Sequence, residues 1–295
     1  MNRDNINGMI YTTVISKEDS IKHLDDRNWA FVDCRFVLRE PEQGFDDYLK
    51  SHIRGAVYAN LDHDLSGPVI KGKTGRHPLP DPGKLVATLS SWGIDAGTQV
   101  VAYDESSGAM AAARLWWLLK WAGHDTVAVL DGGFKQWVDA GYPKSGGLQK
   151  REPGKFEPHF HQEMVAGADD LGKVVDDPSY VIIDARSADR YRGENESIDP
   201  VAGHIRGAIS GPFADNQNEQ GLFKSPEELK AQFERATGGV DAERTIFYCG
   251  SGVTAAHSVL AYVRSGNAIP RLYAGSWSDW ITDPSRPIVT GQSRR

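Results

Sequence analysis

The chain of 295 residues is poor in cysteine, in excess positive charge and in long hydrophobic runs. Its two cysteines, Cys34 and Cys249, are too few for a disulfide framework and are typical of a reducing compartment. No stretch approaches the roughly 18 apolar residues of a membrane span, and residues 1–16 lack the basic segment and apolar core of a secretory signal. We therefore expect a cytoplasmic protein with no membrane partner.

The balance of charge argues against nucleic acid as a partner. The formal net charge is −7, which offers no general attraction for phosphate backbones. Lys71, Lys73 and Arg76 form one short basic cluster, which we interpret as a solvated loop. No cluster of metal-ligating residues stands out, so we expect neither a metal nor an organic cofactor.

Four sequence blocks occur twice, in the same order, which indicates two copies of one domain. The segment between the copies is rich in Pro, Gly and charge, as linkers are. We therefore divide the chain into a first domain (1–143), a linker (144–158) and a second domain (159–295). The paired blocks are AFVDCRF (30–36) with YVIIDAR (180–186), SHIRGAVY (51–58) with GHIRGAIS (203–210), GIDAGTQVVAYDESSGAMAAARLW (93–116) with GVDAERTIFYCGSGVTAAHSVLAY (239–262), and VAVLDGGFKQWVDAGYP (127–143) with PRLYAGSWSDWITDPSRP (270–287).

Each copy alternates short apolar runs with helical patterns. VIID (181–184) and TIFYC (245–249) suit buried strands, and residues 253–265 are apolar at helical spacing. Residues 225–237 open with Ser, Pro and then Glu, which is a good helix start. The sequence thus predicts an α/β fold in which each domain has a small parallel sheet covered by helices on both faces. A ligand is expected beyond the carboxyl ends of the strands.

The segment IFYCGSGVTAAH (246–257) admits two functional interpretations. Its GSGVTA part has the glycine spacing of a dinucleotide-binding loop, but the next strand region, RLYAGS (271–276), lacks the acidic residue that would hold a ribose. The second interpretation is a nucleophilic Cys249. Backbone N–H groups at a helix start favour an anion, so a thiol ionises readily there.

The residues around Cys249 favour the nucleophile. Gly250 and Gly252 let the backbone wrap tightly around the sulfur, and Ser251 and Thr254 add hydroxyl groups. A cysteine that merely fills the core is the simpler alternative, but it would not require such a loop. The loop has no arginine, which excludes the phosphate-binding loop of cysteine-dependent phosphatases.

The repeat places a single functional centre in the second domain. Aligning the two copies puts Asp104 where Cys249 stands, so the first domain keeps the scaffold without the nucleophile. Cys34 and the tryptophans of RLWWLLKW (114–121) are expected to pack in the core.

From about residue 12 to 288, the chain resembles the tandem-domain rhodanese-type sulfurtransferases. The resemblance rests on the VDCRF and HIRGA-type motifs in both halves and on three further motifs. It implies two tandem rhodanese-like domains, the first inactive and the second with a cysteine that cycles through a persulfide. The three further motifs are DLSGPVIKGKTGRHPLPDP (64–82), LDGGFKQW (130–137) and CGSGVTA (249–255).

The active loop distinguishes two branches of that family. Members that use mercaptopyruvate typically carry CGSGVT, as here, whereas members that use thiosulfate typically carry CRKGVT. The resemblance implies that Arg190 binds the substrate anion, because a guanidinium fork suits a carboxylate; a surface ion pair is the alternative. The loop residues Gly250, Gly252, Val253 and Thr254 are expected to complete the binding site.

The resemblance also implies a role for two residues of the first domain. Asp62 and His77 match residues that face Ser251 across the domain cleft and relay protons; for His77 an ordinary turn histidine is the alternative. His52 and His204 occupy the same position in the two copies of the HIRGA motif. Because both domains have this histidine, we expect it to be structural.

One position departs from the mercaptopyruvate branch. That branch often has a second substrate arginine nine residues after the first, where this chain has Asp199; Arg192 is a possible substitute. We expect a transferase that moves sulfur from 3-mercaptopyruvate to a thiol, cyanide or a thioredoxin-like protein. The alternatives are a thiosulfate:cyanide sulfurtransferase and a noncatalytic sulfur carrier or docking module.

Overall fold

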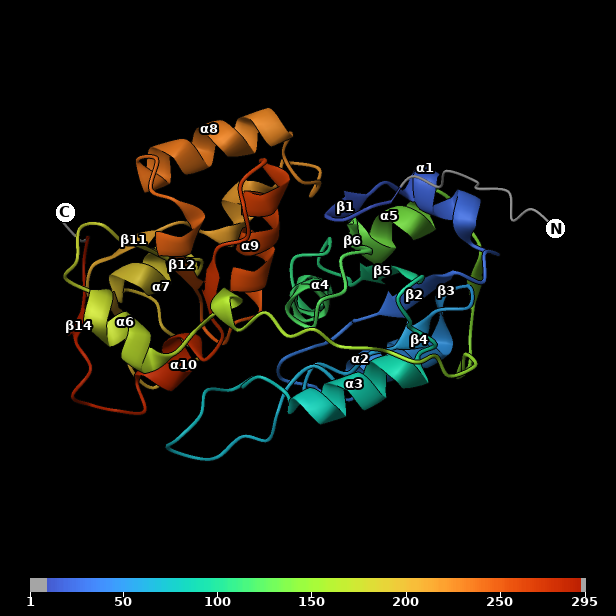
Figure 1. The fold of residues 1–295 in the computed structure, drawn as a ribbon, viewed down its shortest axis with the longest axis horizontal. Coiled ribbons are helices and arrows are strands. Elements are labelled where there is room, and N and C mark those ends of the chain that lie inside the picture. The colour runs from blue at the N-terminus through green and yellow to red at the C-terminus, as the bar shows by residue number, and fades with distance from the viewer. Residues whose placement is uncertain (1–9, 293–295) are drawn as a thin grey trace.

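A computed structural model describes residues 10–292 of the chain. The chain forms two α/β domains that lie side by side, the first blue to green and the second yellow to red (Figure 1). Residues 1–9, which belong to the stretch judged to lack a secretory signal, and residues 293–295 lie outside the described residues. No helix within 10–292 is long and apolar enough to cross a membrane.

Each domain is built on a five-stranded parallel sheet, and the strand order is equivalent in the two sheets. A short antiparallel pair accompanies each sheet, again at corresponding places. The predicted α/β fold with two parallel sheets is therefore confirmed. The first sheet runs β1 (Val14–Ile15), β6 (Val127–Leu130), β5 (Gln99–Tyr103), β2 (Trp29–Asp33), β4 (Val57–Tyr58), and its accompanying pair is β3 (His52–Ile53) with β7 (Lys144–Ser145). The second runs β8 (Val165–Ala166), β13 (Arg271–Tyr273), β12 (Thr245–Tyr248), β9 (Val181–Asp184), β11 (Ala208–Ser210), and its pair is β10 (His204–Ile205) with β14 (Ile288–Val289).

Helices pack around both sheets. The first domain has α1 (Lys17–Ser20), α2 (Gln43–Lys50), α3 (Pro82–Ser91), α4 (Ala111–Trp121) and α5 (Gly133–Asp139), with the 3-10 helix η1 (Ile21–His23). The second has α6 (Ala168–Val174), α7 (Ala188–Arg192), α8 (Pro226–Thr237), α9 (Thr254–Arg264) and α10 (Ser276–Trp280), with η2 (Gln162–Met164), η3 (Phe213–Asn216) and η4 (Ala242–Arg244).

The elements predicted in the second copy form where expected. Strands β9 and β12 lie within 181–184 and 245–249, and α9 lies within 253–265. Helix α8 begins with the predicted cap: Ser225 Oγ accepts the Glu228 N–H at 3.2 Å, and the Glu228 carboxylate accepts the Ser225 N–H at 2.9 Å. Local sequence chemistry therefore sets this helix start.

Helices α4 and α9 pack against each other and join the two domains (Figure 1). Every residue of α4 is buried, because the helix lies between its own sheet and the second domain. Trp116 and Trp117 are fully buried and Trp121 nearly so, which confirms that these tryptophans pack. One apolar cluster runs through both helices and reaches both sheets, so the domains share a continuous core.

Two further segments tie the domains together. The predicted linker begins with β7, which pairs with β3, and then follows the first domain; Arg151 Nη1, for example, donates to the Trp29 carbonyl at 2.8 Å. The second, residues 59–81 between β4 and α3, is here called the crossing segment. It reaches from the first domain to α10 of the second, cyan in Figure 1. There the Arg76 N–H donates to Ser278 Oγ at 3.0 Å.

The paired histidines are built into the two domains in the same way. His52 Nδ1 lies 2.7 Å from the Tyr48 carbonyl oxygen, and His204 Nδ1 lies 2.7 Å from that of Tyr191. Each imidazole also stacks on the ring of the tyrosine whose carbonyl it contacts, and both histidines are buried. Cys34 is also fully buried, as predicted.

In the first domain a carboxylate fills the loop that follows β5. Asp104 accepts hydrogen bonds from the backbone N–H groups of Ser106, Gly108, Met110 and Ala112, at 2.8 to 3.1 Å. The side chain is almost fully buried, so these amides would otherwise lack an acceptor. The loop is thus an anion-binding nest whose anion belongs to the protein.

Replacing Asp104 with Ala should lower the stability of the protein. Leaving several buried N–H groups without an acceptor should cost about 3 kcal/mol in the free energy of unfolding. Urea unfolding measures this cost, and Glu105→Ala, which removes the neighbouring exposed carboxylate, is the matched control. Equal losses in the two variants would contradict the nest.

His257 should make stability sensitive to acid. It is fully buried in α9, stacks on Phe223 and has no hydrogen-bond partner among the described residues. Burial lowers the pKa of His257 from 6.5 to about 3. The unfolded chain therefore takes up this proton first, so stability present above pH 6.5 is lost as the pH falls toward 3.

The slope of stability against pH should include up to ~1.4 kcal/mol per pH unit from this group. Urea unfolding between pH 7 and pH 4 should show a flatter dependence for His257→Leu than for the parent protein. His63→Leu, at an exposed position, is the control and should keep the parent slope.

Candidate active site

Cys249 lies at the carboxyl end of β12, immediately before the turn that leads into α9. Its backbone N–H donates to Ser276 Oγ at 3.1 Å, and its carbonyl accepts the Trp277 N–H at 2.9 Å. The sulfur accepts the Gly252 N–H at 3.2 Å. The residue is 2% exposed. The loop thus fixes the backbone on both sides and directs an amide at the sulfur.

The loop requires glycine at position 252. Gly252 has a φ of +78°, which side chains disfavour, and an added Cβ would lie 2.3 Å from the Ala274 carbonyl oxygen. The tight wrapping predicted for this glycine is therefore present, and it brings the Gly252 amide to the sulfur.

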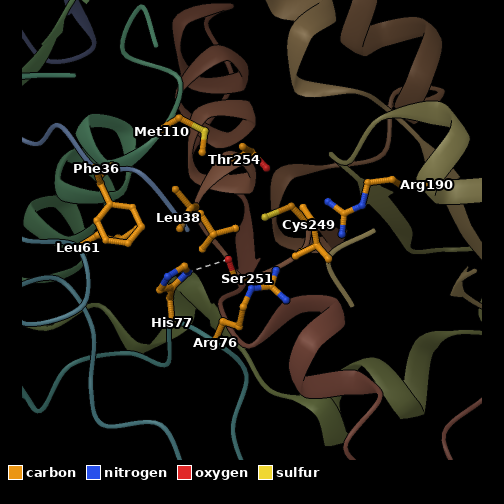
Figure 2. Close-up of a pocket in the computed structure, with 14 residues that line it drawn as sticks. Phe36, Leu38, Leu61, Arg76, His77, Met110, Arg190, Cys249, Ser251 and Thr254 are labelled. Atoms are coloured by element: carbon orange, nitrogen blue, oxygen red, sulfur yellow. Dashed lines mark hydrogen bonds between the residues drawn. The ribbon is translucent and has the colours of Figure 1, made fainter. Parts of the chain in front are cut away.

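A pocket of about 110 Å³ opens over Cys249 between the two domains (Figure 2). Its size, below the roughly 300–1,000 Å³ of sites for drug-sized ligands, favours a small substrate. Both domains line it, so a ligand beside Cys249 contacts both. The first domain contributes Phe36, Leu38, Leu61, Arg76, His77, Met110 and Ala111, and the second contributes Arg190, Ile198, Cys249, Gly250, Ser251, Val253 and Thr254.

Of the predicted site residues, Asp62 and Gly252 do not line the pocket but contact residues that do. Gly252 contacts the Cys249 sulfur, and Asp62 Oδ1 lies 3.3 Å from His77 Nε2. His77 Nδ1 in turn lies 2.8 Å from Ser251 Oγ, across the domain cleft (Figure 2). The three predicted relay residues therefore form one connected chain.

His77 is held in its neutral form. Burial lowers its pKa, against the opposing effect of the Asp62 carboxylate. With the carboxylate at Nε2, the single ring proton belongs there, and Nδ1 accepts the hydroxyl proton of Ser251. The arrangement can take up a proton from the pocket through Ser251 and place the resulting positive charge beside Asp62.

Arg190 of α7 lines the pocket and also forms ion pairs, but with the buried carboxylates of Glu196 and Asp199 rather than at the surface, as its alternative interpretation had it. Its Nε donates to Glu196 at 3.0 Å, and its Nη2 donates to Asp199 at 3.0 Å. Arg192, considered as a substitute for the second arginine, instead pairs with Glu194 and does not line the pocket.

Arg76 corrects the interpretation of the basic cluster as a solvated loop. Lys71 and Lys73 are exposed, but Arg76 is partly buried, lines the pocket and pairs with Asp199 of the second domain. The sequence held one signal for this: Arg76 directly precedes His77, which was already expected in the cleft. The apolar wall made by Phe36, Leu38, Leu61 and Met110 was also missed, because those positions look like ordinary core or loop residues.

A buried guanidinium group forms hydrogen bonds to both sides of the domain cleft. Arg114 of α4 is fully buried; its Nη1 donates to the Gly252 carbonyl at 3.3 Å and its Nη2 to the His77 carbonyl at 3.2 Å. Burial lowers the pKa of Arg114 to about 10, with nearby Cys249 acting in the opposite direction, so the group stays charged at neutral pH. It links the loop of one domain to the crossing segment of the other.

The chain is similar along most of its length to sulfurtransferases. It is 44% identical to a probable 3-mercaptopyruvate sulfurtransferase of Pseudomonas aeruginosa, over 94% of this chain and 98% of that protein. It is 34% identical to the 3-mercaptopyruvate sulfurtransferase of mouse, over 86% of each chain. It is 32% identical to bovine thiosulfate sulfurtransferase, over 87% of this chain and 84% of that protein.

Solved structures agree with this similarity. The 3-mercaptopyruvate sulfotransferase of Escherichia coli superposes with a TM-score of 0.78 at 30% identity, covering 91% of this chain and all of that one. The 3-mercaptopyruvate sulfurtransferase of Leishmania major gives 0.79 at 30% identity, covering 90% of this chain and 73% of that one. The rhodanese-like domain family matches residues 16–140 and 167–283, and the chain therefore belongs to that family, with two copies of the domain in tandem.

Proposed function

We propose that the protein is a sulfurtransferase that moves sulfur from 3-mercaptopyruvate to an acceptor through a persulfide on Cys249. The observation that carries this proposal is the Cys249 sulfur at the floor of a small pocket, beside an amide donor and the chain Ser251–His77–Asp62. The relatives named above support the reaction class.

In the first step, the Cys249 thiolate attacks the thiol sulfur of the donor. A sulfur–sulfur bond forms, the sulfur–carbon bond breaks, and its electron pair leaves with the three-carbon fragment as the enolate of pyruvate. The donor's thiol proton must move from sulfur to carbon to complete the step.

The neutral His77 suits that proton transfer. Its Nδ1 can accept the proton through Ser251, since the hydroxyl already lies 2.8 Å away. The imidazolium formed is stabilised by Asp62, and the same path returns the proton to the enolate carbon, which releases pyruvate.

In the second step, an acceptor takes the outer sulfur and restores the thiolate. A small thiol, cyanide or a thioredoxin-like protein has the nucleophilic sulfur or carbon that this step needs. Ping-pong kinetics follow, because pyruvate leaves before the acceptor reacts. The nucleophile must stay a free thiolate between turnovers, and both cysteines are free thiols, which favours a reducing compartment, the cytoplasm.

The two domains have different roles in the proposed reaction. We assign catalysis to the second domain, 159–295, and consider the first, 1–143, inactive because Asp104 occupies its nest. The linker, 144–158, joins them. The first domain still completes the pocket, since Asp62 and His77 lie on its crossing segment.

Thiosulfate is the second candidate donor. Two guanidinium groups, those of Arg76 and Arg190, line the pocket, and thiosulfate is an anion. Against it, the loop itself offers Gly250 and Ser251 rather than basic side chains.

Steady-state sulfur transfer from each donor to cyanide tests the donor. We expect 3-mercaptopyruvate to exceed thiosulfate in kcat/KM by tenfold or more, about 1.4 kcal/mol of transition-state preference. Cys249→Ser should abolish turnover with both donors. A preference for thiosulfate would reassign the donor, single turnover on either donor would indicate a sulfur carrier, and an active Cys249→Ser would refute the mechanism.

The relay predicts a donor-dependent effect of His77→Gln. With 3-mercaptopyruvate, kcat should fall by roughly 10²-fold, the scale of general acid–base catalysis. With thiosulfate it should change much less, because sulfite leaves without a proton. Burial lowers the pKa of His77 from its ordinary value of 6.5, so the kcat/KM of the parent protein for 3-mercaptopyruvate should not fall through protonation of His77 until the pH is below 6.5. Equal losses with both donors would point to a structural role.

A further inference from the structure

Arg114 of α4 is a charged side chain that is buried without a carboxylate partner. It is fully buried, and within residues 10–292 it forms no ion pair with an acidic side chain. Its hydrogen bonds go to backbone carbonyls, those of Gly252 at 3.3 Å, His77 at 3.2 Å and Pro78 at 3.5 Å, and its Nε has no acceptor in the described part of the chain. Arginine is almost never fully buried unless it is paired, so an anion is expected nearby.

The Cys249 thiolate is the anion that meets this expectation. Arg114 donates to the Gly252 carbonyl, and the N–H of the same glycine donates to the Cys249 sulfur at 3.2 Å. One residue therefore bridges the guanidinium and the nucleophile. Burial lowers the pKa of Arg114 to about 10, and the charge of Cys249 acts in the opposite direction. Because a Coulomb interaction is mutual, the guanidinium favours the thiolate as much as the thiolate favours the guanidinium.

The other charged groups that face the pocket are already paired. Arg76 and Arg190 line it, but both donate to the buried Asp199 carboxylate, and Arg190 also pairs with Glu196. His77 is held neutral, because burial lowers its pKa. Among the described residues around the sulfur, the guanidinium of α4 is thus the cation that no carboxylate offsets.

A comparison of the two domains argues against a purely structural role. The Asp104 carboxylate accepts four backbone N–H groups, whereas the Cys249 sulfur accepts one within residues 10–292, that of Gly252. Arg114 is the fourth residue of α4, and the fourth residue of α9 is His257, whose pKa burial lowers to about 3. This place in the helix therefore does not need a cation for folding. The charge is present only in the helix that contacts the nucleophilic loop.

We propose that Arg114 is the counter-ion of the Cys249 thiolate, so that the inactive domain places a buried positive charge beside the nucleophile and keeps it ionised at neutral pH. Arg114 does not line the pocket, so it acts on the sulfur rather than on the donor and is a positioning residue. The first domain thereby contributes to the reactivity of the nucleophile as well as to the wall of the pocket. The inference rests on the proposed function for the role of Cys249 as the nucleophile.

Alkylation by iodoacetamide tests this ion pair without turnover. The thiolate, not the thiol, displaces iodide, and iodoacetamide is uncharged, so its rate at Cys249 of the reduced full-length protein follows the thiolate fraction. The rate is measured from about pH 6 to about pH 9.5, the range over which cysteines titrate. Mass spectrometry assigns the adduct, and Cys34 is fully buried. The rate at pH 7 relative to the alkaline plateau then reports the nearby charge.

Arg114→Gln should lower the rate at pH 7 by about tenfold and change the alkaline plateau by less than about twofold, because losing the cation lowers the thiolate fraction rather than the reactivity of a thiolate. Arg114→Lys should keep most of the rate at pH 7, because it keeps the charge. Arg151→Gln is the matched control: Arg151 has the same charge and also donates to backbone carbonyls, but it lies in the linker, so the parent profile should remain. Equal falls at both pH values, or a parent profile in Arg114→Gln, overturns the inference.

Urea unfolding tests the ion pair with Arg114 in place, and it decides the question where Arg114→Gln does not fold. A thiolate beside a cation loses its proton at a lower pH in the folded protein than in the unfolded chain, where cysteine titrates at about pH 8.5. The folded state then binds fewer protons, so stability rises with pH over that interval. From pH 6 to pH 9 the folding equilibrium constant of the parent protein should rise about tenfold relative to that of Cys249→Ser. Parallel pH dependences in the two proteins would exclude the ion pair.

Steady-state kinetics separate this inference from the proposed function. At pH 7, Arg114→Gln should lower kcat/KM for 3-mercaptopyruvate by about tenfold, and the loss should shrink toward pH 9 as the thiol ionises without help. If the alkylation profile shifts as expected but the parent protein transfers no sulfur, the ion pair stands and the proposed function is wrong. If the parent protein turns over and Arg114→Gln keeps the parent alkylation profile, the ion pair is wrong and the proposed function stands.

Discussion

The packing of α4 against α9 is the contact on which the active site depends. Helix α9 starts at the turn after Cys249, and α4 carries Arg114, which bonds to that turn and to the crossing segment. Because the apolar cluster is continuous through both helices, separating the domains would expose core side chains to water, at about 25 cal/mol per Å². That cost keeps His77 and Arg76 of one domain against the Cys249 loop of the other.

The corresponding loops of the two domains surround different acceptors, a carboxylate in the first domain and a sulfur in the second. After β5 the amides converge on the Asp104 carboxylate, whereas after β12 an amide points at the Cys249 sulfur. In both domains the turn after the strand thus directs backbone N–H groups at a side-chain acceptor, four of them at Asp104 and one at Cys249. The Asp104 carboxylate occupies the first nest permanently. In the proposed mechanism, the Cys249 sulfur instead gains a second sulfur atom and passes it to an acceptor. The first domain is then left to provide the far wall of the pocket.

One ion pair across the domain boundary joins two residues whose roles were misjudged from the sequence. From the sequence, Asp199 looked like a missing substrate contact, and Arg76 looked like part of a solvated basic cluster. The structure pairs them, 123 positions apart in the chain. No local pattern marks such a pair, because neither residue belongs to a periodic helix or strand and their contact depends on the domain arrangement. By contrast, residues 249–254 were identifiable from the glycine-rich turn before a helix, and Arg190 from the family resemblance.

The sequence by itself determined the duplicated α/β architecture, the strands before and the helix after Cys249, and the cap of α8. These follow from apolar periodicity and short-range hydrogen bonding, which neighbouring residues specify. It also indicated Cys249 as the nucleophile, because the helix start follows it directly. The meeting of Ser251, His77 and Asp62 was implied only by the family resemblance, and the tertiary structure shows the contacts between them. Only the tertiary structure decided that Arg76 and Arg190 both pair with Asp199. Those contacts cross the domain boundary, and the burial of apolar surface between α4 and α9, rather than any local preference, sets them.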